Sequence, residues 1–97
     1  MNILERKKEI KLQIASNNVT EAIKRAMDYV EDFGNDNGMI NEIVVISSNY
    51  FDFSRMSRQA TADDEDLTKK RNRLLHQMLE LLDAVETSFA LSSRINN

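Results

Sequence analysis

The chain has 97 residues, of which 41% are hydrophobic and 30% charged, a composition that fits one small domain and excludes wholesale disorder. Its formal charge of −3 disfavours a dedicated nucleic-acid binder, which usually carries a basic surface, and the absence of cysteine excludes disulfides and thiolate chemistry. The longest apolar run, residues 43–46, is far shorter than the roughly 20 residues of a membrane span. We therefore expect no membrane contact and a cytoplasmic location.

The chain contains no proline and only two glycines, Gly34 and Gly38. Sheet proteins need many turns, and turns depend on these two residue types. The composition therefore predicts an all-α fold with a few long helices and few connections.

The first two predicted helices span residues 2–15 and 19–33. The first has only a narrow apolar stripe. The second has a full apolar face, formed by Val19, Ile23, Ala26, Met27, Val30 and Phe33. Asn18, with Glu21 three residues later, predicts an N-cap for the second helix. Gly34 is a candidate for its C-terminal end, and residues 34–38 form the clearest loop in the chain.

The third predicted helix, residues 39–59, has an apolar arc near half its circumference. Its β-branched run is also compatible with two strands, but the segment's length and its 3–4 spacing favour a helix. We expect the following side chains to lie in that arc: Met39, Ile40, Ile43, Val44, Ile46, Tyr50, Phe51 and Phe53.

The fourth predicted helix spans residues 62–90. A Thr-x-x-Asp pattern at Thr61 to Asp64 partly matches a capping box. Short connections between long helices make neighbours antiparallel, so residues 1–97 are predicted to form a single antiparallel four-helix bundle. Its inward-facing residues are expected to be Leu67, Leu74, Leu75, Met78, Leu81, Leu82, Val85 and Phe89.

The sequence carries no recognisable catalytic or metal-binding pattern. His76, the single histidine, lies opposite the apolar face of the fourth helix, and Arg73 occupies the position where a di-iron bundle would have glutamate. We therefore predict no catalytic residues, no metal and no cofactor, with His76 in solvent.

The basic run 69–73 could contact phosphates, but Glu65 with Lys69 and Asp66 with Lys70 have the spacing of intrahelical ion pairs. Arg71 falls on the apolar face. Either its stem extends along the bundle to reach solvent, or it anchors a partner.

Several motifs of the third and fourth predicted helices belong together. They are Asn41-Glu42-Ile43, Ile46-Ser47-Ser48-Asn49-Tyr50, Arg55, Arg58, Asn72-Arg73-Leu74 and Leu79-Glu80-Leu81-Leu82-Asp83. Together they resemble the effector-associated domain family, type eleven, of bacterial conflict systems, which is grouped with bacterial death-like domains. The resemblance is best over 41–86, and Ala60 departs from it where the family often has glycine. It implies a death-like helical adaptor that is usually fused to a peptidase, TIR or NTPase module and binds like with like, without catalytic residues.

Charge is unevenly distributed: residues 1–27 carry net +3, residues 28–67 net −8 and residues 68–97 net +2. This division is compatible with attraction between antiparallel helices of one molecule, and equally with the acidic surface of one molecule meeting the basic surface of another. We expect a protein partner of the same domain type or a related death-like domain, and a homo-oligomer is one form that this contact can take. A simple oligomerisation module is the first alternative and a small nucleic-acid binder the second. The candidate contact residues are acidic Asp28, Glu31, Asp32 and Asp36, basic Arg55, Arg58, Lys69, Arg71 and Arg73, and apolar Val45, Phe53 and Met56.

Overall fold

The computed structural model describes the backbone of residues 2–34, 36–59 and 64–95, and the side chains of these ranges apart from 56–59, 64 and 92–95. It contains four helices: α1 (Ile3–Ala15), α2 (Val19–Phe33), α3 (Asn37–Gln59) and α4 (Asp64–Ile95). No strand occurs in the described ranges, so the strand alternative for the third element is wrong. Compared with the predicted bounds, α3 begins two residues earlier and α4 continues to Ile95, while Thr61 and the predicted helix start at 62 fall outside the described residues.

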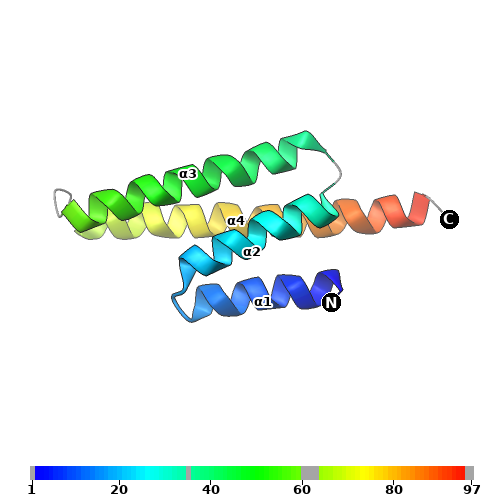
Figure 1. The fold of residues 1–97 in the computed structure, drawn as a ribbon, viewed down its shortest axis with the longest axis horizontal. Coiled ribbons are helices and arrows are strands. Elements are labelled where there is room, and N and C mark those ends of the chain that lie inside the picture. Colours follow the sequence, from blue (N-terminus) through cyan, green and yellow to red (C-terminus); the bar gives the residue numbers. More distant parts are fainter. Residues whose placement is uncertain (1, 35, 60–63, 96–97) are drawn as a thin grey trace.

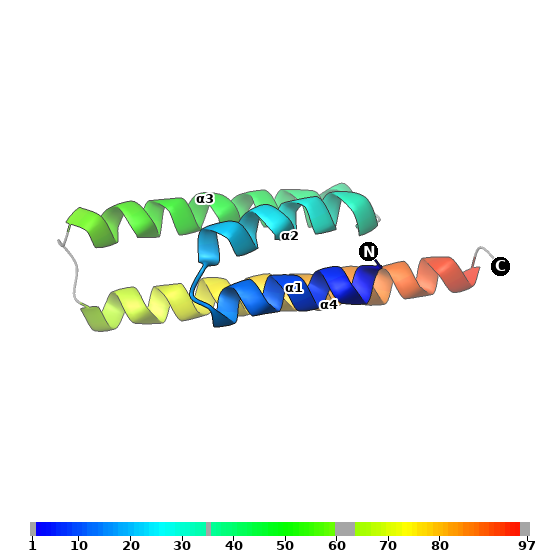
Figure 2. The ribbon, with the colours of Figure 1, turned by 60° about the horizontal axis from the view of Figure 1, so that its bottom comes forward.

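The helices form two antiparallel hairpins, α1–α2 and α3–α4, that pack on each other (Figures 1 and 2). Helix α4 contacts each of the other three helices, whereas the described parts of α1 and α3 make no contact. The predicted all-α, antiparallel bundle is confirmed. The α3–α4 hairpin is the longer one, and it projects beyond α1 and α2 at the end where α3 leads into α4 (Figure 2).

The core lies where α2 faces α3 and the middle of α4. Helix α2 contributes six of its buried residues, whereas α1 contributes only Ile10. Burying a large apolar side chain stabilises a fold by about 1.5–3 kcal/mol, so apolar burial holds α1 less firmly than the other helices. The core residues are Ile10, Val19, Ala22, Ile23, Ala26, Tyr29, Val30, Ile43, Ile46, Met78, Leu81, Leu82 and Val85.

Three side chains that the apolar pattern places in the core are exposed instead: Val44 (48%), Phe51 (49%) and Phe89 (36%). Helix α2 is about 22 Å long and α3 about 35 Å, at 1.5 Å per residue. Helix α2 therefore covers α3 only as far as about Phe51, whereas Val44 lies within that length and is exposed on a flank of α3. Tyr29 shows the opposite error, because the predicted face of the second helix omits it although it is fully buried.

The ends of α2 lie where the sequence predicts them. Asn18 precedes the helix, but its side chain makes no capping bond and donates instead to Gln13 Oε1 at 3.0 Å. Gly34 ends the helix with its amide donating to the Val30 carbonyl at 2.7 Å. A Cβ at Gly34 would lie 2.5 Å from that carbonyl oxygen, so only glycine fits there.

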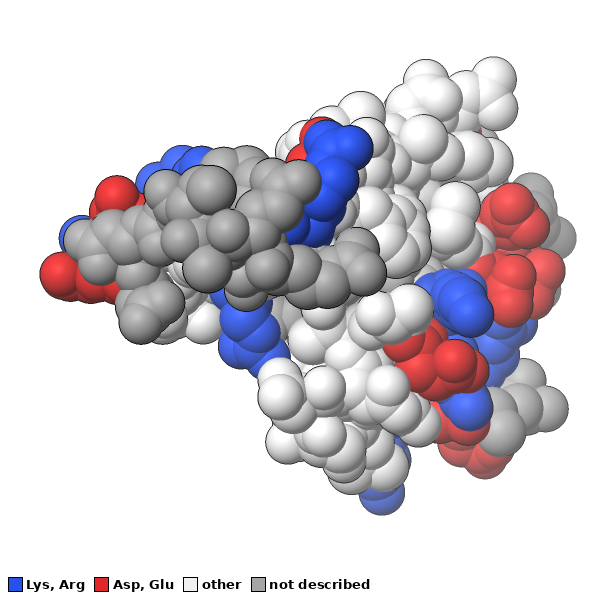
Figure 3. All heavy atoms as spheres, turned by 60° about the vertical axis from the view of Figure 1, so that its left-hand side comes forward, with Lys and Arg blue, Asp and Glu red and all other residues white. Residues whose placement is uncertain are grey.

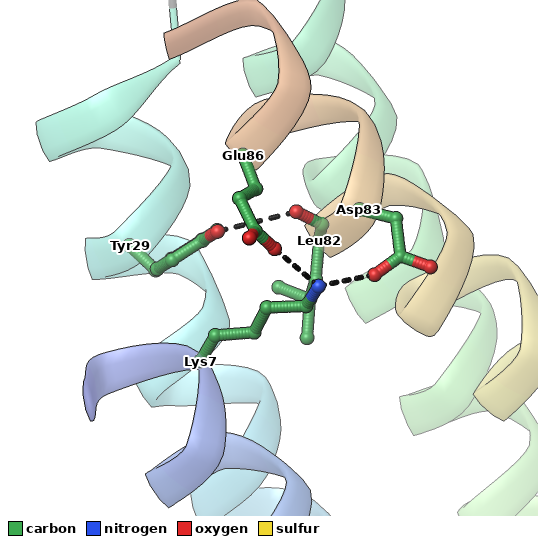
Figure 4. Close-up of polar contacts among 5 residues, drawn as sticks. All are labelled: Lys7, Tyr29, Leu82, Asp83 and Glu86. Carbon is green, nitrogen blue, oxygen red and sulfur yellow. Dashed lines mark hydrogen bonds and ion pairs between the residues drawn. The ribbon is translucent and has the colours of Figure 1, made fainter. Parts of the chain in front are cut away.

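Polar contacts fix the α1–α2 hairpin on α4 (Figure 4). The Tyr29 hydroxyl donates to the Leu82 carbonyl at 3.2 Å. The ammonium of Lys7, whose side chain is 14% exposed, pairs with both Asp83 and Glu86. At the other end of the hairpin, Arg71 of α4 donates to Asn17 Oδ1 in the α1–α2 turn.

These contacts shift three pKa values. Burial raises the pKa of Tyr29 from 10.0 to about 12. Burial also opposes the charged form of Lys7, but the hydrogen bonds and charges of Asp83 and Glu86 outweigh it, and the pKa of Lys7 rises above its usual value. The hydrogen bond from Lys7 lowers the pKa of Asp83. The Lys7–Asp83 ion pair therefore persists across the neutral range.

In the described ranges, each helix is too short or too polar to serve as a membrane span.

Candidate interaction surface

A groove runs along the outer side of the α3–α4 hairpin. It consists of two adjoining hollows, of about 570 Å³ and 360 Å³, that share Asn49 of α3 and Gln77 of α4. One hollow is lined by Glu42, Val45, Ile46, Asn49, Gln77, Glu80, Leu81 and Ala84. The other is lined by Asn49, Asp52, Phe53, Lys70, Arg73, Leu74 and Gln77.

The groove follows from helical spacing. Val45, Asn49 and Phe53 are four residues apart on α3, so they share one side of that helix. Gln77 and Arg73 have the same spacing on α4. The apolar lining is open to solvent, because Val45 is 56% exposed and Phe53 is half-buried.

The charges of the groove are separated along its length. Glu42 and Glu80 line one hollow, and Lys70 and Arg73 line the other. Within the described part of the chain none of these four groups has an ion pair, so the predicted Asp66–Lys70 pair does not form. Asp52, in the basic hollow, is already paired with Arg55 at 3.1 Å. The groove therefore has an acidic end and a basic end, both without intramolecular compensation.

The opposite flank of α3 carries a second exposed apolar pair, Val44 and Phe51, seven residues apart. Figure 3, which views the molecule toward the end where α3 leads into α4, shows a broad uncharged area with charges of both signs on either side of it. The α1–α2 hairpin pairs charges of its own, Arg6 with Asp32 and Arg25 with Glu9.

The predicted basic contact residues are placed in different surroundings. Arg73 lines the groove. Lys69 pairs with Glu65 at 3.8 Å, as its spacing predicts. Arg71 donates a hydrogen bond to Asn17 within the molecule. Neither of the two sequence alternatives for Arg71, extension into solvent or contact with a partner, predicts this arrangement. The side chains of Arg58 and Met56 lie outside the described residues.

The predicted acidic contact residues are likewise divided. Asp32 pairs with Arg6. Asp36 accepts a hydrogen bond from the Met39 amide at 2.9 Å and caps α3. Asp28 and Glu31 are exposed on α2. The acidic group of the sequence prediction is therefore not one free surface.

Of the predicted apolar centre, the structure brings Val45 and Phe53 to the same groove. The groove charges Glu42, Lys70 and Glu80 are contact candidates that the sequence prediction missed. In the sequence, these three residues are spaced so that they share a helix side with Val45 or with Arg73. This spacing identifies them as groove residues only when α3 and α4 are known to lie side by side.

His76 is exposed on α4, as predicted. Over residues 2–34, 36–59 and 64–95, no group of three His, Asp or Glu side chains is arranged to hold a metal ion.

The sequence model of one protein family, Effector-associated domain 11, matches residues 5–86. The chain belongs to the effector-associated domain 11 family. The match confirms the resemblance found in the sequence, and it extends from α1 into α4 and covers every described residue of the groove. An effector-associated domain is a small helical domain of the adaptor type within effector proteins, and its fold is not a catalytic one. No curated protein and no solved structure matches the chain.

Proposed function

We propose that this effector-associated domain is a non-catalytic adaptor that brings effector or sensor modules of a bacterial conflict system together by binding a domain of its own type. Family membership supports the adaptor role. The single structural observation that carries the proposal is the open groove on α3–α4, where exposed apolar groups lie between uncompensated charges.

This combination suits protein–protein contact. Interfaces bury an apolar centre within a polar rim, and rim charges mainly set orientation and the rate of association. Exposed ion pairs contribute only about 0–1 kcal/mol each, so affinity has to come from the apolar groups. Val45 and Phe53 supply that centre, and Lys70, Arg73 and Glu80 supply the rim.

The test measures self-association of the whole chain by sedimentation and light scattering, over a range of concentrations at low and high salt. We expect the average mass to rise with concentration and the association to weaken as salt screens the charges. In parallel, the chain fused to the two halves of a split reporter should assemble the reporter, whereas the Met78→Asp variant, which cannot build its core, should not. A chain that stays monomeric at high concentration and low salt, and that assembles no reporter, refutes the homotypic adaptor.

A further inference from the structure

The residues of the α3–α4 groove are arranged almost symmetrically about its middle. On α3, Val45 and Phe53 lie four residues to either side of Asn49, which is about 6 Å along the helix. On α4, Glu80 lies three residues to one side of Gln77 and Arg73 four residues to the other, about 4.5 and 6 Å along the helix. Asn49 and Gln77 are also the residues that the two hollows share.

A second copy placed face to face and antiparallel fits this arrangement. The second copy is related to the first by a half-turn about an axis that crosses the groove from α3 to α4 at its middle. This rotation sets each α3 against the other α3 and each α4 against the other α4. Val45 then comes opposite Phe53 of the second copy, and apolar groups meet apolar groups. Glu80 comes opposite Arg73 of the second copy, and opposite charges meet twice.

We infer that the α3–α4 groove binds the same groove of a second copy about a two-fold axis that passes near Asn49 and Gln77. The inference rests on the homotypic contact proposed above and specifies its surface and symmetry. Because both copies use the same surface, the contact closes as a dimer and leaves no free groove for a third copy. This differs from a contact between two unequal surfaces, which would propagate into rings or filaments.

The charges favour a second copy over other occupants. A nucleic acid would meet Glu42 and Glu80 at one end of the groove, where its phosphates are repelled. An acidic peptide meets the same obstacle at that end, and a basic peptide meets Lys70 and Arg73 at the other. A surface with one end of each sign is complementary to its own reversed copy.

The first test reverses the two paired charges. Arg73→Glu alone places two acidic groups opposite each other, and Glu80→Arg alone places two basic groups opposite each other, so each variant should associate at least several-fold more weakly than the native chain. An equimolar mixture of the two variants restores both opposite-charge pairs and should form mixed dimers. Lys24→Glu is the control, because Lys24 is exposed on α2 and outside the groove, and it should leave the dimerisation constant within about two-fold. A mixture that stays as weak as its components overturns the inference.

The second test uses the absence of native cysteine. A two-fold axis brings a residue near it close to its own copy, so Asn49→Cys should form a disulfide-linked dimer under mild oxidation. Ser48→Cys is the matched control, since Ser48 is exposed on the neighbouring side of α3 and should cross-link far more slowly. If the native chain self-associates but Asn49→Cys links no faster than Ser48→Cys, the symmetric groove contact is wrong and the homotypic adaptor survives. If the native chain does not self-associate, both fail together.

Discussion

Replacing Tyr29 by phenylalanine should destabilise the protein at neutral pH and stabilise it relative to the native chain at high pH. Tyr29 is 0% exposed, and its hydroxyl donates to the Leu82 carbonyl at 3.2 Å. That carbonyl lies within α4 and keeps its helical partner, so the variant leaves no buried acceptor unsatisfied. The lost hydrogen bond should lower the free energy of unfolding by about 1 kcal/mol at pH 7.

The sign of the effect reverses because burial raises the pKa of Tyr29 from 10.0 to about 12. Between these values the folded chain holds the phenolic proton and the unfolded chain releases it, so native stability falls as pH rises. The loss amounts to about 1.4 kcal/mol by pH 11 and approaches about 2.7 kcal/mol above pH 12. The phenylalanine variant escapes this loss, so the two stability curves should cross near about pH 10.7.

Chemical denaturation followed by far-ultraviolet circular dichroism, from pH 7 to about pH 11, measures both curves. Lys7 titrates in both proteins, so the difference between them isolates Tyr29. Tyr50→Phe, which alters the other tyrosine, controls for the substitution at pH 7. A native chain that stays more stable than the variant by a constant amount up to pH 11 would refute the buried, hydrogen-bonded placement of Tyr29.

Three further substitutions test other parts of the structure. Met78→Asp should abolish folding, because it places an unpaired charge at a position that is 1% exposed, and a cooperative unfolding transition in this variant would contradict the core assignment. Lys7→Met should lower the free energy of unfolding by about 1 kcal/mol and should speed amide hydrogen exchange in α1 more than in α2. Mass spectrometry of peptides resolves the two helices, and equal protection of both would show that Lys7 does not hold α1. His76→Ala should change neither the denaturation midpoint nor self-association, and a loss of either would show that this exposed side chain has a role.

The helices and most of their core faces could be predicted from the sequence because helical periodicity is a local property. Ile23 and Val30 of α2 are seven residues apart, and Met78 and Leu82 of α4 are four apart. Each pair therefore shares one face of its helix, whatever packs against it. Tyr29 could not be placed, because its burial depends on α1 and α4 meeting α2 from two sides. Phe51 could not be placed either, because its exposure depends on how far α2 extends along α3.

The interaction surface, too, could be predicted from the sequence only in part. Val45 and Phe53 could be identified as apolar groups near a polar helix face, since that is a feature of one helix. The groove itself is made by two helices and became visible only with their pairing. Conversely, Asp32 and Asp36 looked free in the sequence because their partners, Arg6 and the Met39 amide, are set by the fold.

Helix α4 presents its core face and its groove face from interleaved positions. Met78 and Leu82 are buried, while Gln77 and Glu80 line the groove, so residues adjacent in sequence serve different surfaces. A substitution at Glu80 therefore leaves the packing of Met78 undisturbed, and partner choice can diverge without loss of the fold. In the symmetric dimer inferred above, a chain that exchanges both charges, Arg73→Glu with Glu80→Arg, would pair with itself and repel the native chain. Two changes on one helix would then separate two sets of copies that share the same fold.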